Sequence, residues 1–132
     1  MKGYSGKILH IDLKTRKTRV EEKPEEWYKL WIGGVSMASR LCWENIKPGC
    51  DAYAPENPIC IANGIFAGTP VPVGGKFGLA SKSPLTGFLG DSLSGSWFSI
   101  ALKRAGWDGV VLHNSSDTWV NVFIDDDRVD FL

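Results

Sequence analysis

Residues 64–95 read GIFAGTPVPVGGKFGLASKSPLTGFLGDSLSG and contain 8 of the 15 glycines in this 132-residue chain, with only three charged residues. Glycine lets a backbone adopt positive φ angles and come close to whatever it contacts. The stretch is also rich in Phe, Leu and Val, so it is too apolar for a flexible linker. Two interpretations follow: a backbone shaped around a ligand, or a run of tight turns between short strands.

The sequence around this stretch predicts an α+β fold with more strands than helices. Apolar alternation and short apolar runs predict strands at residues 6–13, 18–22, 58–64, 76–83, 108–113, 118–124 and 128–132. The first two strands and the last two are each predicted to form a hairpin. Helical spacing with start and stop signals predicts helices at residues 24–32, 36–46 and 94–105. The length suits a single domain, residues 1–132, with a sandwich-like, β-rich architecture.

Composition and charge exclude several classes of function. Fifteen basic and fifteen acidic residues give a net charge of zero, so nothing points to nucleic acid as a general partner. The sequence has no apolar run long enough to span a membrane. Its charged, alternating first residues do not resemble a signal peptide. We therefore expect a cytoplasmic protein.

The residue types that bind metals are scattered along the chain. None of the three cysteines belongs to a CxxC pair, which predicts reduced, buried thiols and no complete iron–sulfur or zinc site; they are Cys42, Cys50 and Cys60. His10 and His113 lie in or beside predicted strands, and we expect structural roles for both. The run Asp125–Asp127 is predicted to be a solvated hairpin tip rather than a metal site. No residue is therefore predicted to ligate a metal.

Short motifs in a fixed order carry a resemblance to a known family. They are GYSGKILHIDL (3–13), WIGG (31–34), APENPICIANG (54–64), GGKF (74–77), SPLTGF (83–88), SGSWF (94–98) and ALKRAGWDGVV (101–111). In this order and spacing, they make the chain resemble the N-terminal domain of the aldehyde ferredoxin oxidoreductase family, the tungsten-pterin enzymes. Seven motifs over about 110 residues make the resemblance specific, although each one alone would be weak.

The resemblance implies a cofactor platform rather than a complete enzyme. In the family this domain is the base for a paired pterin cofactor, tungstopterin or molybdopterin, whose dithiolenes hold the metal. Later domains, absent from this chain, supply a [4Fe-4S] cluster that passes electrons to ferredoxin while aldehydes are oxidised to carboxylic acids. The implied partners are thus the remaining catalytic domains or a partner subunit, with ferredoxin for the whole enzyme. No catalytic residue is expected within this chain.

Two groups of residues are candidates for binding a pterin phosphate. The turn Gly74-Gly75-Lys76 would offer two unobstructed amides and an ammonium. Ser92, Ser94 and Gly95, at a predicted helix start, would offer hydroxyls and free N–H groups. These six residues form the predicted cofactor-binding set.

The chain also departs from the family at cofactor-contacting positions. It has Val35 and Lys76 where the family usually has Arg, and Leu93 where the family has an Asn that binds magnesium. Lysine keeps the charge without the bidentate fork, and leucine has no metal-binding group. A domain that keeps the fold as a non-catalytic scaffold, or that binds a small phosphorylated ligand at the glycine turns, is therefore an alternative. The apolar final strand, ending on Phe131-Leu132, further predicts self-association or pairing with another chain.

Overall fold

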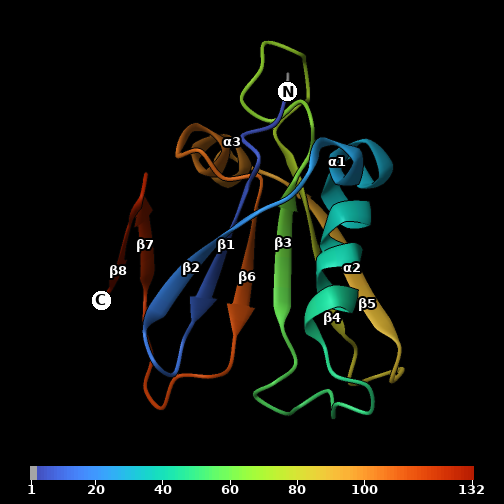
Figure 1. The fold of residues 1–132 in the computed structure, drawn as a ribbon, viewed down its shortest axis with the longest axis vertical. Helices are drawn as coiled ribbons and strands as arrows, with labels where there is room; N and C mark the ends of the chain where they lie inside the picture. The colour runs from blue at the N-terminus through green and yellow to red at the C-terminus, as the bar shows by residue number, and fades with distance from the viewer. Residues whose placement is uncertain (1–2) are drawn as a thin grey trace.

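The computed structural model describes residues 3–132, which form a six-stranded sheet, a two-stranded sheet and three helices (Figure 1). The elements are β1 (Lys7–Asp12), β2 (Lys17–Glu22), α1 (Glu25–Trp31), α2 (Gly34–Asn45), β3 (Ile59–Asn63), β4 (Lys76–Lys82), β5 (Leu89–Gly95), α3 (Trp97–Arg104), β6 (Gly109–His113), β7 (Val122–Asp125) and β8 (Arg128–Phe131). The predicted α+β class is confirmed.

The large sheet has the order β2-β1-β6-β3-β4-β5. Only β1 and β6 are parallel, and every other neighbouring pair is antiparallel. β1–β2 and β7–β8 are the two predicted hairpins, and Asp125–Asp127 lie exposed at the tip of the second. The hairpin-tip prediction is confirmed.

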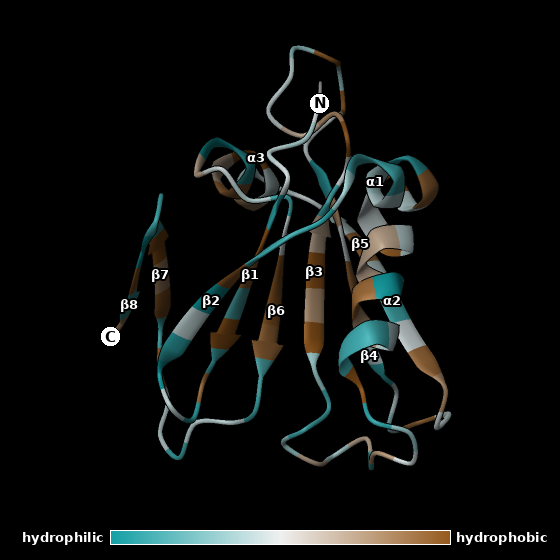
Figure 2. Ribbon diagram, in the orientation of Figure 1, coloured by the Kyte–Doolittle hydropathy of each residue, from teal (hydrophilic) through white to brown (hydrophobic). Residues whose placement is uncertain are grey.

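Each face of the large sheet carries its own apolar core, because side chains alternate along a strand. On one face α1 and α2 cover a cluster that includes Ile8, Tyr28, Leu41 and Val111. On the other face Trp107 and strand residues from β1 and β6 pack with residues of α3 and the β7–β8 hairpin. Figure 2 shows the hydrophobic central strands β3 and β6 between these layers.

Two glycines allow close backbone contacts, Gly78 with α2 and Gly109 with the neighbouring strand β3. A Cβ on Gly78 would lie 2.2 Å from the Val35 backbone nitrogen, so no side chain fits there. A Cβ on Gly109 would lie 2.8 Å from the Ile61 carbonyl oxygen. Part of the glycine content of residues 64–95 therefore serves packing of the chain against itself, as the second interpretation of that stretch proposed.

The main error of the sequence prediction is the strand β5. Leu89–Gly95 is an edge strand with mostly exposed residues, so it lacks the apolar alternation that would have marked it. The helix predicted from Ser94 accordingly begins at Trp97, with Ser96 as its cap. α2 begins at Gly34, and the predicted cap Ser36 lies inside it.

The structure also tests the prediction that the three cysteines are reduced and buried. All three thiols are free; Cys42 and Cys60 are buried, whereas Cys50 is half-buried, so the prediction of burial is wrong for Cys50. Cys50 lies in the loop that follows α2, outside the packed layers. Within residues 3–132, each helix is too short or too polar to cross a membrane.

Candidate functional site

The six predicted site residues lie in two neighbouring segments. Gly74 and Gly75 end the loop before β4, and Lys76 is the first residue of β4. Ser92, Ser94 and Gly95 lie in β5 rather than at a helix start, which corrects the prediction. The register pairs Lys76 with Gly95, Phe77 with Ser94 and Leu79 with Ser92.

The register divides the predicted set between two faces of the sheet. Residues directly opposite each other in an antiparallel pair share a face, and neighbours along a strand alternate. Lys76 and Gly95 therefore lie on the face that α2 covers, as Gly78 does. Ser92 and Ser94 lie on the opposite face, away from Lys76. Their hydroxyls cannot join the lysine around one phosphate.

The space around the paired glycines Gly74 and Gly75 is largely filled by other parts of the protein. A Cβ on Gly74 would lie 2.6 Å from the Phe66 carbonyl oxygen, and the Gly74 N–H already donates to the Val71 oxygen at 3.1 Å. A Cβ on Gly75 would lie 3.2 Å from Ile100 Cδ1. The prediction of two unobstructed amides is thus wrong for Gly74, because a tight turn uses its N–H.

A cavity of about 230 Å³ brings Lys76 together with residues that the prediction did not include. Its lining includes Gly33 and Gly34, from the turn between α1 and α2, and Gly64, directly after β3. A Cβ on Gly33 would lie 2.7 Å from the Asn63 carbonyl oxygen, so this turn lies tightly against β3. The WIGG motif was the signal for these residues in the sequence.

The N-terminus of α2 adds favourable electrostatics to this cavity. No side chain in residues 3–132 caps the first turn of α2, whose N-cap is Gly33. The first N–H groups of a helix lack intrahelical partners and carry partial positive charge. Gly34 is buried, but it lines the cavity, has φ +58° and has open space where a Cβ would be. Among residues 3–132, Lys76 is the only charged residue in the lining.

These donors fit a phosphate better than a metal ion. Backbone N–H groups and an ammonium suit an anion. Leu93, which also lines the cavity, contributes only an apolar side chain. No cluster of His, Cys, Asp or Glu within residues 3–132 could hold a metal ion. The cavity can therefore hold the phosphate of a cofactor, while any magnesium ion would need other ligands.

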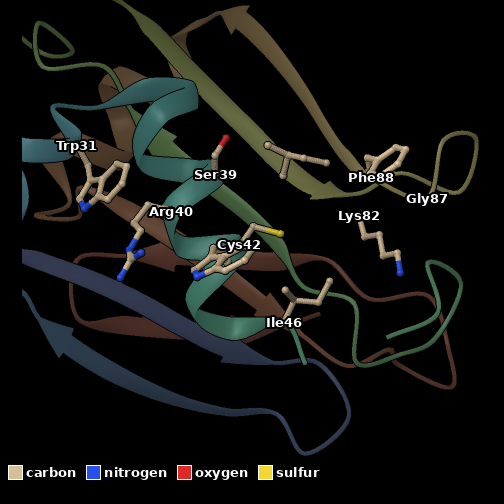
Figure 3. Close-up of a pocket in the computed structure, with 10 residues that line it drawn as sticks. Trp31, Ser39, Arg40, Cys42, Ile46, Lys82, Gly87 and Phe88 are labelled. Carbon is tan, nitrogen blue, oxygen red and sulfur yellow. The ribbon is translucent and has the colours of Figure 1, made fainter. Parts of the chain in front are cut away.

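A second cavity, of about 500 Å³, is mostly apolar and lies between α2 and the loop joining β4 to β5. Figure 3 shows Trp31, Arg40 and Ile46 on its α-helical side and Phe88 across from them. Phe88 is 79% exposed, and Trp43, also in the lining, is 75% exposed. Large exposed aromatic side chains around a cavity are typical of a surface that another chain or domain covers.

Comparison with known proteins gives the same assignment as the motifs. Residues 8–132 match the family model described as aldehyde ferredoxin oxidoreductase, N-terminal domain. The chain is 38% identical to the tungsten-containing aldehyde ferredoxin oxidoreductase of Thermococcus kodakarensis and 36% identical to that of Pyrococcus furiosus. Each alignment covers 98% of this chain but only 22% of the relative. The chain thus spans about a fifth of the length of these relatives.

Two more distant similarities extend this comparison. The WOR-like subunit of an aliphatic sulfonate oxidoreductase from Pyrococcus furiosus is 29% identical, over 98% of this chain and 21% of its own length. Among solved structures, the active-site complex BamBC of benzoyl coenzyme A reductase, in complex with 1,5-dienoyl-CoA, superposes with a TM-score of 0.92 at 25% identity. That match covers 98% of this chain and 20% of the other. The chain therefore belongs to the aldehyde ferredoxin oxidoreductase family, as its N-terminal domain.

Proposed function

We propose that this chain forms part of the seat for a pterin cofactor in a larger tungsten- or molybdenum-pterin oxidoreductase. The observation that carries the proposal is the cavity where the uncapped start of α2 meets Lys76. Its backbone donors and single ammonium suit the phosphate of a pterin. The bound metal-pterin group would supply the redox chemistry, whereas this chain would bind and orient the cofactor.

Lys76 and the first turn of α2 have different parts in this proposal. Lys76 would contribute a charge-assisted hydrogen bond from an exposed, adjustable side chain. The Gly34 amide would contribute a fixed donor, since packing of Val35 against Gly78 positions the helix on the sheet. Gly95 would keep a side chain away from the lysine, and Gly75 would allow the close contact with Ile100, while Ser92 and Ser94 would face other parts of the enzyme.

The whole enzyme would oxidise an aldehyde to a carboxylic acid and pass the electrons through a [4Fe-4S] cluster to ferredoxin in the cytoplasm. Relatives named as tungsten-containing aldehyde ferredoxin oxidoreductases support this, at 35–38% identity. The cluster and the substrate-binding groups would come from further domains or a partner subunit. The apolar cavity beside Trp43 and Phe88 is a suitable place for these parts to pack.

The alternative is a scaffold domain that keeps the fold without a cofactor. Leu93 favours it, because this residue lines the cavity at the position where the family usually supplies a magnesium ligand. Under this alternative the cavity would be filled by a partner chain, and Lys76 would be an ordinary surface residue.

Cofactor analysis of the protein purified with any partner chain tests the proposal. Tungsten and molybdenum are measured by mass spectrometry, pterin by the fluorescence of its oxidised derivative, and activity by aldehyde-dependent reduction of ferredoxin. We expect stoichiometric metal and pterin together with aldehyde oxidation. A partner complex with neither metal nor pterin would reject the proposal and support the scaffold. Bound cofactor without aldehyde oxidation would support the cofactor seat and reject the aldehyde substrate.

A further inference from the structure

A cavity of about 540 Å³, lined by polar and charged residues, lies at the far end of the sheet from Lys76. It opens where β1 and β6 end and β2 begins, and its lining includes His10, Lys17, Arg19 and His113. The register places Arg19 beside His10. β6 runs antiparallel to β3, with Leu112 beside Ile59, so this cavity and Gly64 lie at opposite ends of β3 (Figure 1). The cofactor cavity does not extend to it.

The two histidines form a hydrogen-bonded chain that ends on a carboxylate. His10 is 2% exposed; its Nε2 lies 2.8 Å from Glu21 Oε2, and its Nδ1 lies 2.8 Å from His113 Nε2. A carboxylate accepts, so His10 Nε2–H donates to Glu21 and the neutral ring accepts at Nδ1. His113 must then donate through Nε2–H. Its Nδ1 has no hydrogen-bond partner within residues 3–132.

Among the described residues, two cations, Arg19 and Lys17, and one carboxylate, that of Asp12, line this cavity. Arg19 donates to His10 Nδ1 at 3.0 Å, and neither Arg19 nor Lys17 forms an ion pair in the described part of the chain. Burial lowers the pKa of both imidazoles, and the charge of Arg19 lowers both further. The histidines are therefore neutral at physiological pH, beside two cations that form no ion pair within residues 3–132.

The two nearby carboxylates are already engaged. Asp12 Oδ1 accepts from the backbone nitrogens of Lys14 and Thr15, each at 2.9 Å, and its Oδ2 accepts from Asn114 at 2.9 Å. Glu21 accepts from His10 and pairs with Lys23 at 2.8 Å. Neither is available to neutralise Arg19, although the charge of Asp12 opposes the binding of a second anion nearby.

We propose that this cavity binds a small divalent oxyanion, of the phosphate or sulfate type, through Arg19, Lys17 and His113. A bound anion favours the imidazolium form of His113, which can donate from Nδ1 to the anion while Nε2–H still donates to His10. Binding is thus coupled to uptake of one proton by His113. The cavity is larger than one phosphate, so the ligand is either the free ion or the phosphate group of a small ester.

Calorimetric titration tests this proposal. The probe is sulfate, which keeps the same charge between about pH 5 and pH 8 and so separates the titration of His113 from that of the ligand. The purified protein carries Lys76→Ala, so that the cofactor cavity does not contribute. We expect saturable binding that tightens toward the acid end of this range, by up to about tenfold per pH unit, with uptake of up to one proton, which is measured by comparing two buffers of different ionisation enthalpy.

Three variants distinguish a built site from a generally basic hairpin. Arg19→Gln should weaken binding at least tenfold, because a charged hydrogen bond is lost. His113→Gln should abolish the proton uptake and the pH dependence. Arg16→Gln is the matched control, since Arg16 is exposed in the same hairpin and does not line the cavity. It should change the affinity less than threefold.

Three results would overturn the proposal: no saturable binding, equal weakening by Arg16→Gln and Arg19→Gln, or binding without proton uptake. If Arg19→Gln fails to fold, as judged by circular dichroism, the His113 variant still decides through proton uptake. Inorganic phosphate and glycerol phosphate are then compared at the pH of tighter binding. Tighter binding of glycerol phosphate would assign the cavity to a phosphate ester, and tighter binding of phosphate to the free ion.

Discussion

Lys76 and Gly95 lie directly opposite each other in the β4–β5 pair, and Lys76 Nζ lies 3.0 Å from the position that a Cβ on Gly95 would take. The lysine side chain therefore lies across a glycine at the open edge of the sheet. A residue with a side chain at position 95 would have to displace only the flexible end of Lys76. This arrangement keeps the ammonium beside the cavity at the start of α2 without fixing it there.

Substitution of Lys76 is expected to weaken phosphate binding and leave folding almost unchanged. Lys76→Ala should lower the affinity for a pterin phosphate, or for inorganic phosphate as a mimic, by about 1.5–3 kcal/mol, the range for a charged hydrogen bond. Lys76→Arg should retain or increase the affinity, because the guanidinium suits phosphate. Titration of the assembled protein measures both, with the exposed Lys47→Ala as control. Equal affinities for all four proteins would remove Lys76 from the site.

Gly78→Ala should destabilise the protein by about 1–3 kcal/mol or more, because its Cβ would overlap the backbone at Val35 and push α2 off the sheet. Gly95→Ala is the matched control on the adjacent strand. Its Cβ would meet only the end of the Lys76 side chain, so it should cost less than about 1 kcal/mol. Urea unfolding measures both changes. Similar losses for the two variants would show that α2 is not held by this close contact.

The strands that the sequence predicted correctly are those with a clear apolar pattern. β1, with Ile8 and Leu9, and β6, with Val110 and Val111, lie in the centre of the sheet, where burial selects such residues. β5 is an edge strand whose pairing depends on β4, so its own residues carry little signal. A single sequence therefore reveals a strand only where burial of the strand has selected apolar side chains.

The candidate site was only partly predictable for a related reason. Lys76 was identified from local chemistry, but the assignment of Ser92, Ser94 and Gly95 to the same site depended on a helix that is a strand. Alternation along that strand turns both serines to the other face. Similarly, the contact between His10 and His113 depends on a parallel pairing between distant segments, which spacing alone does not reveal.

Asp108→Asn should destabilise the protein by about 3 kcal/mol, because Asp108 is 1% exposed and its carboxylate pairs with Lys103. The same carboxylate accepts from the backbone nitrogens of Ser5 and Gly6, at 3.0 and 2.7 Å. The Asn side chain would turn its NH₂ group toward the N–H donors of Ser5 or Gly6. It would also leave Lys103 without its carboxylate partner.

The control for Asp108→Asn is Asp125→Asn, an exposed carboxylate 3.8 Å from Arg128, which should change stability by less than about 0.5 kcal/mol. Thermal and urea unfolding compare the two variants. A change at Asp108 as small as that at Asp125 would contradict a role for this ion pair in fixing the start of β1 to β6.

Stability should fall as the pH drops below neutrality, because burial lowers the pKa of His10 from 6.5 to about 4. The folded state therefore holds His10 neutral, while the unfolded state takes up a proton once the pH falls below about 6.5. The contribution is fully present above the unfolded pKa and is lost progressively down to about pH 4. A shift of this size corresponds to at most about 3 kcal/mol.

His10→Gln tests this assignment, because glutamine can still donate to Glu21 but does not titrate in this range. The free energy of unfolding is measured by urea titration between about pH 4.5 and pH 7.5, in buffers free of phosphate and sulfate. The unsubstituted protein should lose about 2–3 kcal/mol across this range, and the variant clearly less, although it starts from a lower stability. Burial also lowers the pKa of His113, so the His10→Gln variant should retain some dependence of stability on pH. Adding His113→Gln should remove that remaining dependence. Parallel profiles for the unsubstituted protein and His10→Gln would show that His10 does not control acid stability, and the slope would then belong to His113 or to carboxylates that titrate at lower pH.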